Sequence, residues 1–194
     1  MTVLPDPLRA AFRAVPREPF LPAAQRGRAE IDAPLPIGAG QTNSQPSTVA
    51  DMLSLLEVRP GHRVLDLGAG SGWTTALLAQ LVGPDGSVIG LERQEQLLGP
   101  ARAALAAHDP AGVAEIRRAR PGVLGAPEDA PFDRILVSAG AEQLPQELLE
   151  QLADPGVLVI PVREQMLRIV REGEDVRQSV HGAYRFVPLV EDPG

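Results

Sequence analysis

An apolar strand, a glycine-rich loop and an apolar helix follow one another without interruption between residues 63 and 82. Residues 63–67 have the composition of a buried strand, 68–72 read Gly-Ala-Gly-Ser-Gly, and 73–82 have that of a helix. A strand of this kind that leads into a helix is typical of a parallel sheet covered by helices. Such sheets bind ligands beyond the carboxyl ends of their strands, so the glycine loop is a candidate ligand site.

The same alternation of strands and helices continues along the chain. We expect further strands at 87–91, 113–118, 133–138, 157–161, 166–171 and 183–187. We expect other helices at 8–14, 47–57, 94–107, where Gly99-Pro100 should kink or restart the helix, and 145–153. The pattern predicts one α/β domain over residues 1–194, with a Rossmann-like, doubly wound, mostly parallel sheet and helices on both faces.

Residues 19–48 are rich in proline and should be extended. Thirty residues without regular structure are too many for a simple connection in a compact domain, so we expect an ordered segment that covers another part of the molecule. The helix that follows should have Pro46 in its first turn and Ser44 or Ser47 as its cap.

Charge and composition exclude several classes of function. The net charge is −7 and all 18 basic residues are arginine, which argues against binding of nucleic acid through phosphates. The chain has no apolar run long enough for a membrane span, no signal-peptide core and no cysteine. We therefore expect a cytoplasmic protein with no metal site, no nucleic-acid partner and no membrane partner.

The glycine loop favours one class of cofactor. A dinucleotide fingerprint needs Gly at position 73, where this chain has Trp73, and a phosphate-binding P-loop needs a lysine. Asp66, two residues before the loop, is placed to meet an ammonium group. Glu92, at the end of the second strand, stands where a carboxylate accepts hydrogen bonds from ribose hydroxyls. Together these residues favour S-adenosylmethionine; the alternative is that the glycines serve packing alone.

A second signature lies in the proline-rich segment. Residues 36–46 read Pro-Ile-Gly-Ala-Gly-Gln-Thr-Asn-Ser-Gln-Pro, which resembles the substrate loop of protein-L-isoaspartate O-methyltransferases. The resemblance covers most of the chain and includes 15–18, 64–72, 92–93, 130–137, 155–156, 159–161 and 186–189. It implies that residues 1–57 form a substrate-covering segment with the substrate loop, and that residues 58–194 form the cofactor-binding core.

The resemblance also implies a set of site residues. Ser44 would be the catalytic residue, with Gln41 and Pro46 beside it in the substrate site. Expected contacts with S-adenosylmethionine, and with its product S-adenosylhomocysteine, are Thr42, Asn43, Gln45, Asp66, Gly68, Ala69, Gly70, Ser71, Gly72, Glu92, Arg93, Pro121, Gly122 and Val190. The implied substrates are isoaspartyl proteins or peptides, and we expect a monomer.

The implied chemistry needs few groups. The α-carboxylate of an isoaspartyl residue is already a nucleophile at neutral pH, so no general base is required. The protein has to desolvate this carboxylate and align it with the sulfonium methyl group. In the family, the methyl ester then collapses to a succinimide without the enzyme.

The sequence departs from the family pattern at Pro121, where relatives usually carry an Asp that holds the adenine. Loss of this hydrogen bond would cost about 1.5–3 kcal/mol of cofactor binding. Arg120 replaces a nearby Gly, Asn43 stands where Ile is common, and few residues follow Val190.

Other functions remain open at this point. The chain could form an aspartimide in a dedicated peptide, or be a degenerate relative with little activity. Trp73 disfavours a nucleotide-dependent oxidoreductase. We expect His62, His108 and His181 on the surface, and the basic run Arg117-Arg118-Ala119-Arg120 as a solvated strand end.

Overall fold

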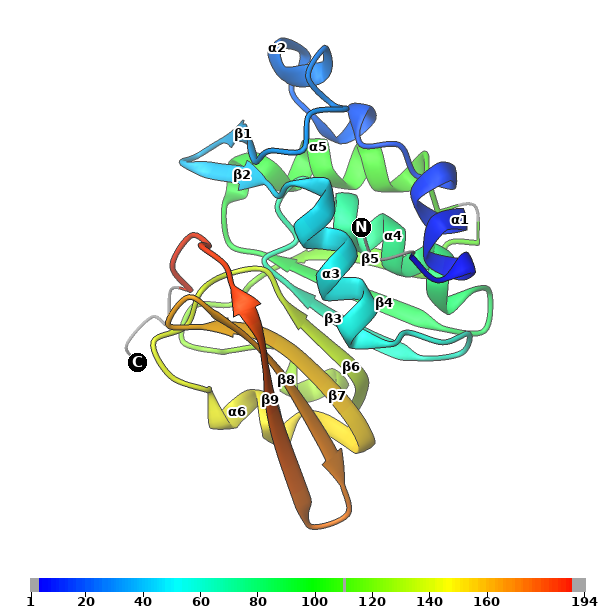
Figure 1. Cartoon of the computed structure of the whole chain (residues 1–194). Helices are drawn as coiled ribbons and strands as arrows, with labels where there is room; N and C mark the ends of the chain where they lie inside the picture. The colour runs from blue at the N-terminus through cyan, green and yellow to red at the C-terminus, as the bar shows by residue number, and fades with distance from the viewer. Residues whose placement is uncertain (1–3, 110, 190–194) are drawn as a thin grey trace.

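One seven-stranded sheet organises residues 4–109 and 111–189, which the computed structural model describes (Figure 1). The strand order is β5-β4-β3-β6-β7-β8-β9; the first five in this order are parallel, and β8 and β9 are antiparallel. The bounds are β3 (Arg63–Leu67), β4 (Ser87–Glu92), β5 (Ala114–Arg118), β6 (Phe132–Val137), β7 (Leu152–Val162), β8 (Gln165–Glu172) and β9 (Asp175–Ala183). The predicted α/β class is confirmed.

The parallel pairing of β3 decides where the ligand crevice lies. Leu67, the last residue of β3, pairs with Leu91 of β4 on one side and Val137 of β6 on the other. The three strands therefore end at the same level, and strand order reverses at β3. The loops after β3, β4 and β6 meet at this edge, which is where doubly wound sheets bind ligands.

Helices cover both faces of the sheet, as predicted, but unequally. One face carries α3 (Pro46–Leu56), α4 (Trp73–Val82) and α5 (Glu95–Ala106), with α1 (Asp6–Ala14) packed on α3 and α4. The other face carries the short helix α6 (Gln146–Glu150) together with the loop that precedes β6.

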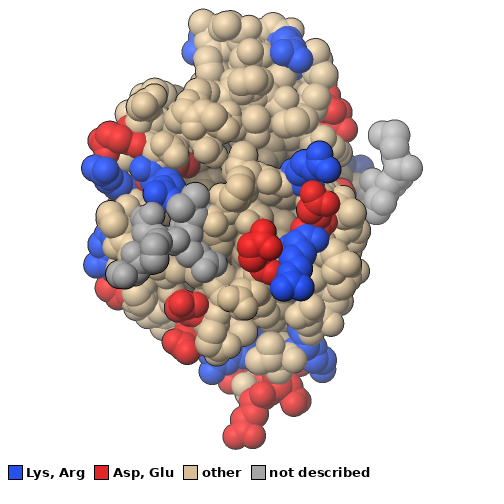
Figure 2. Space-filling model, turned by 90° about the vertical axis from the view of Figure 1, so that its left-hand side faces the viewer, with Lys and Arg blue, Asp and Glu red and all other residues tan. Residues whose placement is uncertain are grey.

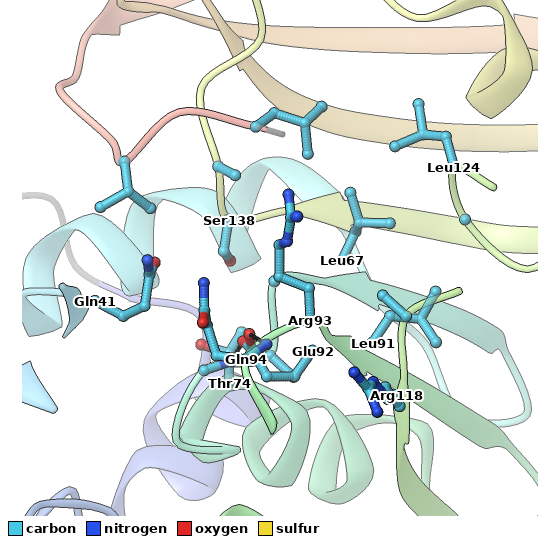
Figure 3. Close-up of a pocket in the computed structure, with 18 of the residues that line it drawn as sticks. Gln41, Leu67, Thr74, Leu91, Glu92, Arg93, Gln94, Arg118, Leu124 and Ser138 are labelled. Carbon is cyan, nitrogen blue, oxygen red and sulfur yellow. Dashed lines mark hydrogen bonds between the residues drawn. The ribbon is translucent and has the colours of Figure 1, made fainter. Parts of the chain in front are cut away.

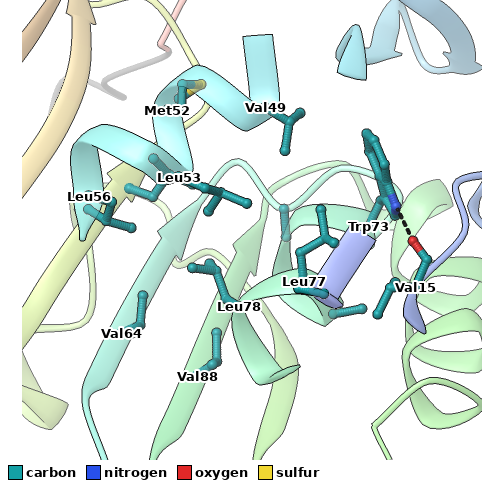
Figure 4. Close-up of a cluster of buried hydrophobic side chains, with 14 of the residues drawn as sticks. Val15, Val49, Met52, Leu53, Leu56, Val64, Trp73, Leu77, Leu78 and Val88 are labelled. Atoms are coloured by element: carbon teal, nitrogen blue, oxygen red, sulfur yellow. Dashed lines mark hydrogen bonds between the residues drawn. The ribbon is translucent and has the colours of Figure 1, made fainter. Parts of the chain in front are cut away.

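Alternating strand residues supply the two cores. Val64 points to the helix-rich face, where it meets leucines of α3 and α4, whereas Leu65 points to the opposite face (Figure 4). Both side chains are fully buried. Full burial of an aliphatic side chain contributes about 1.5–3 kcal/mol, so a chain with few aromatic residues can still build a sufficient core.

The proline-rich segment differs from the extended structure we expected. It contains a 3-10 helix (Glu18–Phe20), a short helix α2 (Ala23–Arg26) and a hairpin of β1 (Leu35–Gly38) and β2 (Gln41–Asn43). Three consecutive residues of positive φ, Gly38, Ala39 and Gly40, make the hairpin turn. A small core of this segment packs against Leu97 of α5. The segment is thus ordered, as predicted, and stands over the edge where β3 and β4 end (Figure 1).

Three predictions about helices need correction. Helix α5 continues through Pro100, which is tolerated because Gln96, whose carbonyl loses its partner, faces solvent. Helix α6 stops at Glu150, since β7 begins at Leu152. Neither Ser44 nor Ser47 caps α3; the cap residue is Gln45, and Asp32 accepts a hydrogen bond from the Ser47 N–H at 2.9 Å.

The last strand is 175–183 rather than 183–187. Every residue of β9 is exposed, so its sequence lacks the alternation of apolar and polar residues that marks a half-buried strand. The chain after β9 instead returns to the loop that follows β6, where Leu189 N–H donates to the Gly140 carbonyl at 2.8 Å.

Two glycines with nearly the same positive φ allow the cost of backbone strain to be measured separately from the cost of crowding. Gly61 and Gly72 have φ of +84° and +85°, but a Cβ at Gly61 would meet nothing within 4 Å, whereas one at Gly72 would lie 2.8 Å from Ile116 Cδ1. Gly61→Ala should cost about 1–2 kcal/mol of unfolding free energy through strain alone. Gly72→Ala should cost a further ~1–3 kcal/mol through overpacking between α4, α5 and β5. Urea unfolding of both variants measures the difference; equal losses would contradict the packing role of Gly72.

Candidate active site

A cavity of about 640 Å³ opens at the carboxyl ends of β3, β4 and β6. Most of the lining residues fall into four groups: the predicted substrate loop at 41–44, the glycine loop with the start of α4, the ends of β4 and β5 with the loop after β5, and the segments at 138–139 and 187–189. Figure 3 shows Gln41, Glu92 and Ser138 entering the cavity from three different segments. The predicted cofactor loop and substrate loop therefore face one space.

The structure brings together most of the predicted site residues. Those that line the cavity are Gln41, Thr42, Asn43, Ser44, Gly68, Ala69, Gly70, Ser71, Glu92, Arg93, Pro121 and Gly122. Gln45, Pro46, Asp66 and Gly72 are not among the lining residues. Val190 lies outside the described residues.

Glu92 is held in place by backbone groups. Its Oε2 accepts a hydrogen bond from the Gly70 N–H at 2.8 Å, and its Oε1 accepts one from the Gln94 N–H at 2.7 Å. The side chain is only 5% exposed. Each carboxylate oxygen can accept more than one hydrogen bond, so Glu92 presents fixed acceptors for hydroxyl groups at the end of β4.

Asp66 points away from the cavity, contrary to our prediction. It shares a face of β3 with Val64 and lies beneath α4, where Thr75 Oγ1 donates to its Oδ2 at 2.6 Å. Its Oδ1 is buried and has no partner within the described residues. Burial raises the pKa of Asp66 to about 6 because the charged form is poorly solvated there. Strand alternation therefore places Asp66 in the core rather than at the pocket.

Asn43 lines the cavity, but other protein groups engage its amide. Its Oδ1 accepts a hydrogen bond from Arg17 Nε at 2.7 Å, and its Nδ2 donates to Ser71 Oγ at 2.9 Å. The side chain thus links the substrate loop to the glycine loop. Arg17 belongs to a run of the sequence that matches the family, but sequence reasoning assigned it no role.

Trp73 both packs in the core and lines the cavity. Phe12 of α1 meets its ring edge-on at a centroid distance of 5.6 Å, and its Nε1 donates to the Val15 carbonyl at 3.1 Å. The guanidinium of Arg17 lies over the ring, 5.6 Å from its centroid. Trp73 therefore forms a wall where α1, α4 and the substrate loop meet.

The loop after β5 forms the far end of the cavity. The described residues 119–125 carry no carboxylate, in agreement with the departure at Pro121. Buried Gln151 holds the loop, since its Nε2 donates to the Leu124 carbonyl at 2.8 Å and its Oε1 accepts from the Ala126 N–H at 2.8 Å.

The basic run beside this loop takes part in ion pairs. Arg118 pairs with Glu95 at 2.9 Å, and Arg120 pairs with Glu128 at 2.5 Å. All four side chains are about half exposed or more, so each pair contributes little, as for most surface ion pairs. Acidic and basic side chains are interspersed on the face shown in Figure 2, without a large area of one sign.

Sequence reasoning missed the residues that line the cavity after β6 and near the end of the described chain. Ser138 and Ala139 follow β6, and 187–189 lie beside them because the Gly140 N–H donates to the Val187 carbonyl at 2.8 Å. The only signal was the family resemblance at 186–189. Further lining residues that were not predicted are Leu67, Trp73, Thr74, Leu91, Gln94, Arg118, Ala119, Arg120, Val123, Leu124, Gly125 and Glu147.

The described residues hold no group of three His, Cys, Asp or Glu side chains placed to bind a metal ion. His62, His108 and His181 lie outside the cavity lining. No helix in the described part of the chain is both long and apolar enough to cross a membrane.

Comparisons with known proteins identify the family of the chain. The profile of the protein-L-isoaspartate(D-aspartate) O-methyltransferase (PCMT) family matches residues 2–194. The protein-L-isoaspartate O-methyltransferase of Methanopyrus kandleri is 47% identical over 189 residues, which are 95% of this chain and 83% of that protein.

Two solved structures share the fold. A structure named protein-L-isoaspartate O-methyltransferase superposes with a TM-score of 0.86 at 24% identity; the match covers 96% of this chain and 62% of that one. A Plasmodium falciparum protein assigned to the same activity, in complex with S-adenosyl-L-homocysteine, gives a TM-score of 0.85 at 26% identity and covers 97% of this chain and 92% of that one. The family match over nearly the whole sequence and the high identity to its members show that this chain belongs to the protein-L-isoaspartate(D-aspartate) O-methyltransferase family.

Proposed function

We propose that this chain transfers the methyl group of S-adenosylmethionine to the α-carboxylate of L-isoaspartyl residues in damaged proteins. One observation carries the proposal: Ser44 and the substrate loop line the same cavity as Glu92 and the glycine loop. A methyl donor held by one loop is thereby placed beside an acceptor held by the other, as an in-line displacement requires.

The cavity fits S-adenosylmethionine better than a phosphate-bearing cofactor. The buried carboxylate of Glu92 suits the ribose hydroxyls and would repel a phosphate nearby. The glycine loop lets the backbone approach the methionine part closely, with Gly68 and Gly70 at φ of +87° and +55°. The loop after β5 would hold the adenine. Bound S-adenosylmethionine supplies an electrophilic methyl group on a sulfonium.

Ser44 and neighbouring backbone groups would hold the substrate. Ser44 Oγ can donate a hydrogen bond to one oxygen of the isoaspartyl α-carboxylate and so orient the other oxygen toward the methyl group. The carboxylate attacks without losing a proton, which agrees with the positions of the three histidines outside the cavity lining. Transfer of the methyl group leaves a carboxyl methyl ester and S-adenosylhomocysteine.

The apolar residues in the cavity wall would also exclude water from the reacting groups. Trp73, Leu67, Leu91 and residues 187–189 place apolar surface around the reacting groups. Removal of water from the carboxylate strengthens its attraction to the sulfonium and raises its reactivity. Apolar surface next to the reacting groups therefore favours this transfer.

The proposal predicts selective methylation of isoaspartate. With labelled S-adenosylmethionine and two matched peptides, one with L-isoaspartate and one with normal aspartate, base-labile label should enter the isoaspartyl peptide alone. Label on the aspartyl peptide would favour a dedicated peptide substrate. No label on either peptide, together with absent binding of S-adenosylhomocysteine in calorimetry, would indicate a degenerate relative.

Ser44→Ala should separate methyl transfer from cofactor binding. Loss of one hydrogen bond to a charged group costs about 1.5–3 kcal/mol, so kcat should fall about 10- to 100-fold while the Kd for S-adenosylhomocysteine changes little. Ser54→Ala is the control, because Ser54 lies on α3 and donates only to the Ala50 carbonyl. Unchanged turnover of Ser44→Ala would remove Ser44 from the mechanism.

Pro121→Asp should tighten cofactor binding. A carboxylate at this position can accept a hydrogen bond from the adenine amino group and should lower the Kd for S-adenosylhomocysteine by about tenfold or more. Pro127→Asp adds the same charge outside the cavity lining and should leave the Kd unchanged. If calorimetry gives equal Kd values for both variants, another group already serves the adenine.

A further inference from the structure

The buried guanidinium of Arg17 joins two stretches of the proline-rich segment. The residue lies just after α1 and is only 5% exposed. Its nitrogens donate to backbone carbonyls in two stretches of chain, at 2.9–3.4 Å, and to Asn43 Oδ1 at 2.7 Å. The accepting carbonyls belong to Ala29, Ile31, Ala33, Asn43 and Ser44.

Two of these contacts orient the peptide groups around Ser44. Arg17 Nη2 donates to the Asn43 carbonyl at 3.0 Å and to the Ser44 carbonyl at 2.9 Å. Neither peptide bond is among the cis bonds of the chain, so each N–H points opposite to its carbonyl. The N–H groups of Ser44 and Gln45 therefore point away from Arg17.

Arg17 and the cavity lie on different sides of the substrate loop. Ser44 lines the cavity, whereas Arg17 is buried behind the loop and is not a lining residue. Because Arg17 draws both flanking carbonyls to its own side, the two N–H groups are directed to the other side. Consecutive N–H groups beside a serine hydroxyl are suited to bind a carboxylate.

The same guanidinium is connected to the glycine loop. Asn43, which accepts a hydrogen bond from Arg17 Nε, donates to Ser71 Oγ at 2.9 Å. Next to this link, Ile37 of β1 packs over Gly70: its Cδ1 lies 3.4 Å from where a Cβ of Gly70 would be. Arg17 also rests on Trp73, at the start of α4. The substrate loop is thus fixed relative to the loop predicted to hold the methyl donor.

We propose that Arg17 is a positioning residue for methyl transfer, which orients Ser44 and the N–H groups of Ser44 and Gln45 toward the substrate carboxylate. This inference rests on the proposed function. Arg17 itself touches neither substrate nor methyl donor. It acts through the backbone of the substrate loop and through Asn43.

The geometry requires an arginine. Its planar guanidinium offers five donors in a fixed arrangement, whereas a lysine ammonium offers three donors at a single point. A lysine at position 17 keeps the positive charge and much of the packing but cannot reach carbonyls in both stretches at once. Arg17→Lys should therefore loosen Ser44 more than it disturbs the glycine loop.

The experiment compares Arg17→Lys with Arg13→Lys, an exposed control on α1 with the same chemical change. Methylation of the isoaspartyl peptide is measured as kcat and KM, and each preparation is normalised to its binding sites for S-adenosylhomocysteine, counted by calorimetry. We expect kcat per binding site to fall about 10- to 100-fold in Arg17→Lys, because small misplacements of reacting groups have effects of this size. Its Kd for S-adenosylhomocysteine should stay near that of the wild type, and Arg13→Lys should match the wild type throughout.

Trp73 provides a readout that does not depend on activity. It is the one tryptophan of the chain, and its ring lies under the Arg17 guanidinium. Its emission should change in Arg17→Lys while the response to S-adenosylhomocysteine is retained, because Trp73 also lines the cavity. Emission identical to the wild type would show that the substitution does not disturb the contact between residue 17 and Trp73, and this result would count against the inference.

The outcomes separate the inference from the proposed function. An unchanged kcat per binding site in Arg17→Lys, or a loss of activity only in proportion to lost binding sites, would overturn the positioning role. If Arg17→Lys binds no S-adenosylhomocysteine, a second variant, Asn43→Ala, tests the inference. This variant removes the hydrogen bond between Arg17 and the Asn43 side chain but keeps the five contacts of Arg17 with carbonyls. Its kcat per binding site should fall below that of the wild type, by a smaller factor than expected for Arg17→Lys. An inactive wild-type chain would overturn the proposed function, and this inference with it.

Discussion

The parallel pairing of β3 with β4 and with β6 is the constraint on which the site depends. It brings three strand ends to one level and leaves a crevice above them. The chain must turn sharply there to enter α4, and glycine supplies the positive φ values that the turn needs. Glu92, at the end of β4, then accepts a hydrogen bond from the Gly70 N–H, so the sheet and the loop hold each other in place.

The proline-rich segment (19–48) needs a different kind of support, because it has little regular structure and only a small core of its own. A single buried charge compensates for this. The donors of Arg17 satisfy backbone carbonyls that would otherwise lose hydrogen bonds on burial. The same guanidinium that stabilises the segment also binds the carbonyls of Asn43 and Ser44.

The reaction explains why the cavity can work without a histidine in its lining. A carboxylate acceptor needs no base, and a sulfonium donor needs no acid, so binding, orientation and exclusion of water are the tasks left to the protein. The carboxyl group of Asp66 lies beneath α4 in the core, where burial raises its pKa to about 6. A perturbed pKa here reflects desolvation in the core rather than a role at the reacting atoms.

Local pattern was sufficient for the strand, loop and helix at 63–82 and for the position of Glu92 at the end of β4, because each is encoded by residues close together in the sequence. It failed for β9, whose exposed faces show no alternation, and for Asp66, whose direction depends on which face α4 covers. Arg17, Ser138 and residues 187–189 reach the site only through contacts between distant segments. The sequence by itself determined the fold class and the two loops, since hydrogen bonding and periodicity act over a few residues; only the tertiary structure decided which side chains meet, since that depends on how the whole chain packs.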